Sequence, residues 1–159
     1  MDLEALALAV DERVWSPAAE RRSGRLYAVR CHSGAGADVG GVVLELLAEG
    51  EARTLPQQVH LPAGVRAVAL VSGVWAAPLE DDGSTRPPSR HPERRRAHIT
   101  VLVGEEGRSD GVDVCVLRYG DGVPAVLRGG VGLIHQRLLR CWSRRPEASR
   151  AAGRPTPAA

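Results

Sequence analysis

Four arginines and a histidine lie within seven residues near the middle of the chain. They are Arg90, His91, Arg94, Arg95 and Arg96. A guanidinium group can donate two parallel hydrogen bonds to a carboxylate or a phosphate, and a histidine can transfer protons near neutral pH. These residue types therefore predict an anion-binding segment, and we take the five residues as the candidate binding site.

This segment has three alternative interpretations. In the simplest, the arginines are solvated and pair with the acidic residues Glu80, Asp81 and Asp82 of the same loop. In the second, the segment binds an acidic protein partner. In the third, the chain is a small enzyme that acts on an anionic substrate, with His91 as acid or base and Arg94–Arg96 holding the anion.

The sequence offers no recognisable catalytic, metal or cofactor motif. Ser72 lacks the first glycine of the Gly-x-Ser-x-Gly pattern, and Cys31 and His32 are neighbours that point to opposite faces of a strand. His91, Glu93 and His98 do not have the spacing of a zinc site. No glycine-rich stretch continues into the Gly-Lys-Ser/Thr of a phosphate loop. We therefore expect no catalytic residues, no metal and no cofactor.

The positive charge is local rather than global. The formal net charge is only +2, yet residues 86–96 contain five arginines against one glutamate, and residues 144–159 contain four against one. The remainder of the chain is acidic, unlike a general nucleic-acid binder. No aromatic residue lies among these arginines in the sequence to stack on bases. An accessory nucleic-acid contact through the loop and the tail is the weaker alternative, and we favour an acidic protein partner.

Hydrophobic periodicity places this segment between regular elements. Apolar spacing predicts a helix over 2–14, and alternation predicts strands over 25–31, 66–77, 96–103, 112–117 and 123–127. A last helix is expected over 131–142. Residues 42–49 are ambiguous, because Val42 and Val43 favour a strand while Leu44, Leu47 and Ala48 have helical spacing, and we predict a helix. Prolines and glycine in residues 79–92 argue against regular structure there.

Together these elements predict an α+β fold. We expect one domain over residues 1–142, a mostly antiparallel sheet packed by the N- and C-terminal helices, and a disordered tail over residues 143–159 rich in Arg, Pro and Ala.

Homo-oligomers are possible through a sheet edge or through Trp15 and Trp142, if these are exposed. All three cysteines are expected to be reduced and buried. An acidic start and the lack of long apolar runs favour a cytoplasmic protein without a membrane segment.

Three stretches carry a resemblance to a group of proteins. They are Arg25-Leu-Tyr-Ala-Val, Leu61-Pro-Ala-Gly-Val-Arg-Ala-Val-Ala-Leu-Val, and His91-Pro-Glu-Arg-Arg-Arg before a strand hairpin. Over residues 25–142 the chain resembles uncharacterised actinobacterial α+β proteins that have a His-Pro-acid-Arg segment at the same place. The resemblance implies a fold type and an actinobacterial source but no catalytic residues. Our functional expectation is thus a non-enzymatic binding or protein-interaction domain that uses its Arg-rich loop.

Overall fold

A computed structural model describes residues 2–15, 23–32, 41–77, 88–106, 109–120, 122–130 and 132–146. Within this part the elements are α1 (Leu3–Val14), β1 (Gly24–Cys31), β2 (Val42–Gly50), α2 (Leu55–Gln58), β3 (Ala67–Ala76), the 3-10 turn η1 (Pro88–Arg90), β4 (Arg95–Glu106), β5 (Ser109–Arg118), β6 (Ala125–Arg128) and α3 (Leu133–Ser143). The described strands form one antiparallel sheet in the order β2-β1-β3-β4-β5-β6. The predicted α+β class is confirmed.

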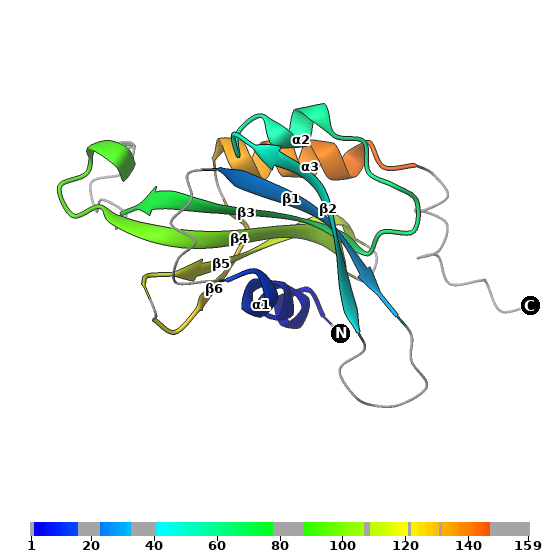
Figure 1. The fold of residues 1–159 in the computed structure, drawn as a ribbon, viewed down its shortest axis with the longest axis horizontal. Coiled ribbons are helices and arrows are strands. Elements are labelled where there is room, and N and C mark those ends of the chain that lie inside the picture. The colour runs from blue at the N-terminus through cyan, green and yellow to red at the C-terminus, as the bar shows by residue number, and fades with distance from the viewer. Residues whose placement is uncertain are drawn as a thin grey trace, which may run out of the picture.

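The sheet is covered on both faces. Helix α1 packs on one face, and α2 and α3 pack on the other, as Figure 1 shows with the sheet between them. Each face has its own apolar core, one centred on α1 and one on α3. Alternate residues of β3 therefore enter different cores, which explains why this strand is apolar at nearly every position.

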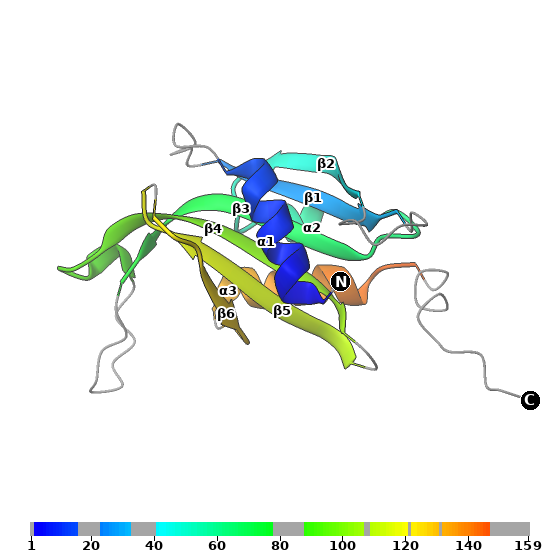
Figure 2. The same cartoon turned by 90° about the horizontal axis from the view of Figure 1, so that it is seen from below.

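Helix α1 forms where the sequence predicts it. The Asp2 carboxylate accepts a hydrogen bond of 2.8 Å from the Ala5 amide and so caps the first turn. Leu3, Leu6 and Val10 share one face of the helix and are buried against the sheet. In Figure 2, which looks onto this helix, α1 lies across the strands of the sheet.

The prediction of a helix over residues 42–49 is wrong, because they form the edge strand β2, paired with β1. The pairing shifts register beside Leu26 and Tyr27, which marks a β-bulge. Leu44 packs in the α1 core while Leu47 and Ala48 pack in the α3 core. Because the bulge moves the apolar residues from one face of the strand to the other, their spacing resembles that of a helix. Pairing with β1 nevertheless makes this segment a strand.

Both faces of β4 are buried in its middle. Ile99 and Val101 face the α3 core, and Thr100 and Leu102 lie under α1. The short elements α2 and η1 were not expected. Both are single turns, and η1 lies within residues 79–92, where the sequence argued against regular structure.

The folded part continues beyond residue 142. Helix α3 includes Ser143, and the Arg145 side chain is buried, pairs with Glu105 and stacks on Trp142. Because Trp142 is itself buried, it offers no exposed contact for a homo-oligomer. Residues 147–159, most of the predicted tail, lie outside the described residues.

The cysteines differ from one another in exposure. Cys115 and Cys141 are buried, as expected, but Cys31 is exposed at the end of β1, and its predicted burial is wrong. The alternation of residues along a strand does not show where the helices that cover the sheet end, so it could not show that Cys31 lies beyond them. Among the described helices, none is long and apolar enough to cross a membrane.

Candidate anion-binding site

Strands β3 and β4 extend beyond their neighbours as a two-stranded ribbon. The pairing of β1 with β3 ends at Val71, and the pairing of β5 with β4 ends at His98. Beyond both of these ends, residues 74–76 and 95–97 continue to pair with each other, and we call this part of the hairpin the ribbon tip. Figure 1 shows it projecting from the body, with η1 at its end.

An exposed tryptophan gathers two of the predicted arginines at the ribbon tip. Trp75 lies directly opposite Arg96 in the β3–β4 register. The guanidinium carbons of Arg94 and Arg96 lie 5.1 and 4.9 Å from the centroid of the indole ring, within the range of a cation–π contact. Trp75 is 40% exposed. We refer to Trp75, Arg94 and Arg96 as the Trp75 patch.

The positive charge of this patch is not neutralised by the part of the chain that the structure describes. No described carboxylate forms an ion pair with Arg90, Arg94, Arg95 or Arg96. Glu80, Asp81 and Asp82, the predicted partners, lie outside the described residues. A cation–π contact restrains a guanidinium group without cancelling its charge, so Arg94 and Arg96 keep their capacity to bind an anion.

His91 stabilises the turn that positions Arg94. Its side chain is buried, and its Nδ1 accepts a hydrogen bond of 3.0 Å from the Glu93 amide. Its backbone carbonyl accepts bonds from the Arg94 amide, at 3.2 Å, and from the Arg94 guanidinium, at 3.3 Å. This ring therefore supports the loop from inside, and does not project beside the arginines as a surface acid or base would.

The five predicted site residues do not form one cluster. Arg94 and Arg96 meet at Trp75, while Arg90 is exposed at the end of η1. Arg95 is exposed opposite Ala76, and strand alternation places it on the other face of the ribbon from Arg96. Sequence reasoning missed Trp75, which belongs to the preceding strand and comes beside the arginines only through the hairpin register.

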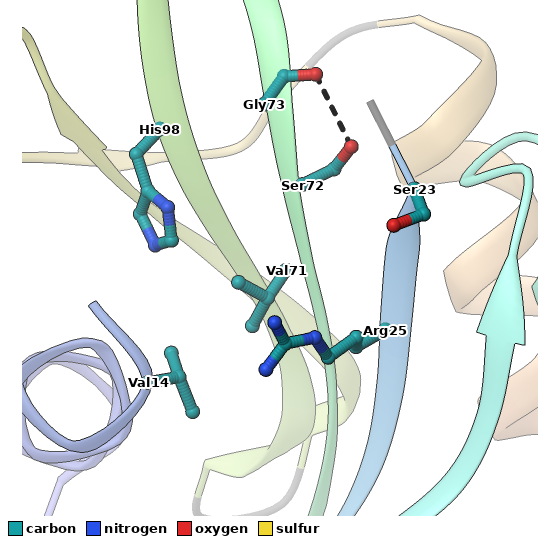
Figure 3. A pocket seen from close by; sticks show the side chains of 7 residues that line it. All are labelled: Val14, Ser23, Arg25, Val71, Ser72, Gly73 and His98. Atoms are coloured by element: carbon teal, nitrogen blue, oxygen red, sulfur yellow. Dashed lines mark hydrogen bonds between the residues drawn. The ribbon is translucent and has the colours of Figure 1, made fainter. Parts of the chain in front are cut away.

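A second polar site lies at the C-terminal end of α1. His98 Nε2 is 3.5 Å from Asp11 Oδ1 and 3.4 Å from the Thr100 hydroxyl. The same histidine borders a shallow cleft with Val14, Ser23, Arg25, Val71, Ser72 and Gly73, and this cleft has room for about one water molecule. Figure 3 shows the Arg25 and His98 side chains directed toward the space beside Val71.

The arrangement around this cleft is not a nucleophile–base pair. Along β3, Ala69 and Val71 belong to the α1 core, and Val68 and Leu70 belong to the α3 core. By alternation, the side chain of Ser72 lies on the α3 face, and its hydroxyl donates to the Gly73 carbonyl at 3.2 Å. His98, which alternates with Thr100 and Leu102, lies on the α1 face. The sheet thus separates the two groups.

A third polar contact joins α3 to the sheet. Asp113 Oδ2 accepts a bond of 2.7 Å from the Gly130 amide and lies 2.7 Å from His135 Nδ1. His135 is therefore the partner of a buried carboxylate at the first turn of the helix. In the described residues, no three or more His, Cys, Asp or Glu side chains gather as a metal site would require.

Comparison of the chain with protein-family models, with curated proteins and with solved structures found no match. The functional argument therefore rests on the site itself.

Proposed function

We propose that this chain is a non-enzymatic interaction module that binds an acidic segment of a partner protein through the Trp75 patch. The observation that carries the proposal is the exposed Trp75 ring with two guanidinium groups about 5 Å from its centroid and no described carboxylate paired to them. Each of these two guanidinium groups can form a charge-assisted hydrogen bond with an acidic side chain of a peptide.

The position of the patch supports this proposal. It lies at the end of a ribbon that extends from the body, so a partner can reach it without contacting the two cores. Residues 86–96 also concentrate positive charge in a chain that is acidic outside this segment and the tail, and such local charge accelerates encounter with an acidic partner and disfavours contact with a basic one.

The test is binding of a fluorescent poly-glutamate peptide to the purified protein, followed by anisotropy at low and moderate salt. The double variant R94Q/R96Q should weaken binding about tenfold or more. The matched control is R66Q/R140Q, which removes two exposed arginines that lie outside the ribbon tip and form no ion pair within the described residues. The control should change affinity less than about twofold, because it leaves the local field intact.

Two results would refute the proposal. One is equal weakening by both double variants, which would mean that only net charge matters. The other is tighter binding of an oligo(dT) strand of matched charge, with the same dependence on Arg94 and Arg96, which would assign the patch to single-stranded nucleic acid. Thermal unfolding within a few degrees of wild type for both variants ensures that binding, rather than folding, is being compared.

A further inference from the structure

Strand β2 forms one edge of the sheet and has no strand partner on its outer side among the described residues. Figure 2 shows it along one border of the sheet. We propose that two copies of this chain dimerise through this edge. Residues 42–46 pair antiparallel with the same residues of the second copy, about a two-fold axis at Leu44, and the two sheets become one. This inference does not depend on the function proposed for the Trp75 patch.

The direction of the backbone groups in β2 follows from one hydrogen bond at the start of the strand. The His32 amide donates to the Gly41 carbonyl at 3.3 Å, in the register of the β1–β2 ladder. Hydrogen-bonded and non-hydrogen-bonded pairs alternate along an antiparallel ladder, so the backbone groups of Val43 and Glu45 face β1. The residues between and beside them direct their N–H and C=O groups outward. They are Val42, Leu44 and Leu46.

The Val42 carbonyl gives independent evidence for this direction. It accepts a hydrogen bond from the guanidinium group of Arg13, which belongs to α1 and not to the β1–β2 ladder. A carbonyl oxygen has two lone pairs, so this contact can persist beside a new strand. Pairing about Leu44 forms four backbone hydrogen bonds even without the Val42 carbonyl. Two join Leu44 to its symmetry mate, and two join the Val42 amides to the Leu46 carbonyls.

The α1 face of this edge supplies apolar contact. Leu44 packs against the α1 core, and Leu46 lies opposite Tyr27 of that core, so both side chains lie on this face. Leu46 is 50% exposed, and Val43 on the opposite face is exposed as well. Pairing about Leu44 places Leu46 opposite Val42 of the second copy. Apolar surface that now faces water is thereby covered, which favours association.

Charge and the β-bulge select Leu44 as the axis. The longest two-fold registers that pair the outward groups are centred on Leu44, Glu45 or Leu46. An axis at Glu45 would set its carboxylate directly opposite that of the second copy, and like charges in this position destabilise a sheet. An axis at Leu46 would place the bulge that follows this residue inside the new ladder and interrupt its pairing. An axis at Leu44 sets Glu45 opposite Val43 and uses only the regular part of the strand.

A second copy fits this edge better than an acidic peptide does, because Glu45 and Glu49 make β2 itself acidic. The opposite edge strand, β6, is a poorer place for pairing. It has only four residues and follows Pro124, which has no N–H to donate. The two edges therefore provide a test strand and a control strand in the same molecule.

The first experiment measures molar mass by light scattering and the dimer dissociation constant by analytical ultracentrifugation. Wild type should be mostly dimeric at about 100 μM. L46E should raise the dissociation constant about tenfold or more, because each dimer would bury two unpaired carboxylates. L127E is the matched control, since Leu127 of β6 is 52% exposed and the added charge is the same. It should change the constant less than about twofold.

Two outcomes of this experiment would overturn the inference. A wild type that stays monomeric at about 100 μM would exclude the dimer. Equal weakening by L46E and L127E would show that association does not depend on β2. Circular dichroism and thermal unfolding of both variants establish that each is folded, which is expected because both substitutions are at exposed positions.

Disulfide cross-linking tests the register. V43C and E45C are prepared separately in a C31S background, which removes the exposed native thiol. After mild oxidation, a covalent dimer should form in a mixture of the two variants about tenfold faster than in either alone, because Val43 of one copy lies opposite Glu45 of the other. Rapid cross-linking of E45C by itself would place the axis at Glu45 and refute the register.

Hydrogen exchange distinguishes pairing between copies from pairing within one chain. Exchange of the Leu44 and Leu46 amides should slow at least severalfold between about 1 and 100 μM protein, and that of the β6 amides should not change with concentration. Slow exchange at Leu44 and Leu46 that is independent of concentration, in a monomer, would show that another segment of the same chain covers this edge. That result would overturn the dimer and leave the proposal for the Trp75 patch intact.

Discussion

Asp11 of α1 and Arg118 of β5 form an ion pair inside the molecule. The Asp11 side chain is fully buried, and its Oδ2 accepts a hydrogen bond from Arg118 Nε. The same carboxylate accepts a bond of 2.8 Å from the Thr100 hydroxyl, and the Arg118 guanidinium carbon lies 5.0 Å from the centroid of Trp15. The helix that covers one face of the sheet is therefore fixed by a polar contact as well as by its apolar face.

Removing this carboxylate should destabilise the fold strongly. In D11A, Arg118 would keep its contact with Glu12 but would lose its fully buried partner, and we expect a loss of about 3 kcal/mol or more in the free energy of unfolding. E12Q is the matched control, because Glu12 pairs with the same arginine from an exposed position, and should cost less than about 1 kcal/mol. Urea denaturation measures both, and equal losses would contradict a special role for Asp11.

The contribution of Asp11 should depend on pH. Burial by itself would raise the pKa of this carboxyl, but hydrogen bonds from His98, Arg118 and Thr100 outweigh burial and lower the pKa below 3.8. A lowered pKa in the folded state means that the stabilisation is complete above the unfolded-state pKa and is lost as the pH falls through the folded-state value.

Denaturation of wild type and D11N from pH 7 to pH 2.5 tests this dependence. The difference in unfolding free energy between them should be constant above about pH 5 and shrink below about pH 4. A difference that stays constant over the whole range would show that Asp11 does not titrate with a lowered pKa.

Gly104 on β4 should not tolerate a side chain. A Cβ placed there would lie 2.8 Å from Leu3 Cδ2 and 3.0 Å from both the Ala67 Cβ and the Arg66 carbonyl oxygen. We expect G104A to cost about 1–3 kcal/mol, because α1 would have to move away from the sheet. G41A is the control, since its Cβ would meet nothing within 4 Å. Thermal unfolding of the two variants should differ by several degrees, and matching values would refute the close approach.

The three thiols should differ in reactivity in the native protein. Burial, followed by the negative charges of Asp113 and Asp11, raises the pKa of Cys115 to about 11, and burial also raises the pKa of Cys141. Because the thiolate is the reactive form, both should resist alkylation at neutral pH, whereas exposed Cys31 should react. Mass spectrometry after brief iodoacetamide treatment should show one modification, located at Cys31, and three after denaturation.

Replacing Trp75 should weaken anion binding without removing a charge. In W75L the guanidinium groups of Arg94 and Arg96 lose the ring that restrains them, and each such contact is worth about 0.5–1 kcal/mol at an exposed site. We expect a severalfold loss in affinity for poly-glutamate and a smaller loss in W75F, which retains an aromatic face. Unchanged affinity in W75L would assign binding to the arginines alone.

Local patterns predicted the parts of the fold that have a single consistent period. Helix α1 has its cap and its apolar stripe in one uninterrupted run, and β4 and β5 pair in a constant register from His98 to Gly104. Strand β2 was mistaken because its bulge breaks the period of two. The sequence analysis missed Asp11. A carboxylate within an apolar helical stripe indicates a buried cation, but the pattern does not identify that cation as Arg118.

Local sequence patterns also predicted part of the candidate site. The sequence alone predicted a strand that begins at Arg96, with Arg94 in the loop before it, and showed that their charge is concentrated, because composition and periodicity are local properties. Only the tertiary structure brought Trp75 beside them and directed His91 inward. Those relationships depend on strand order and register, which are set by pairing between residues far apart in the chain and are not encoded in any single segment.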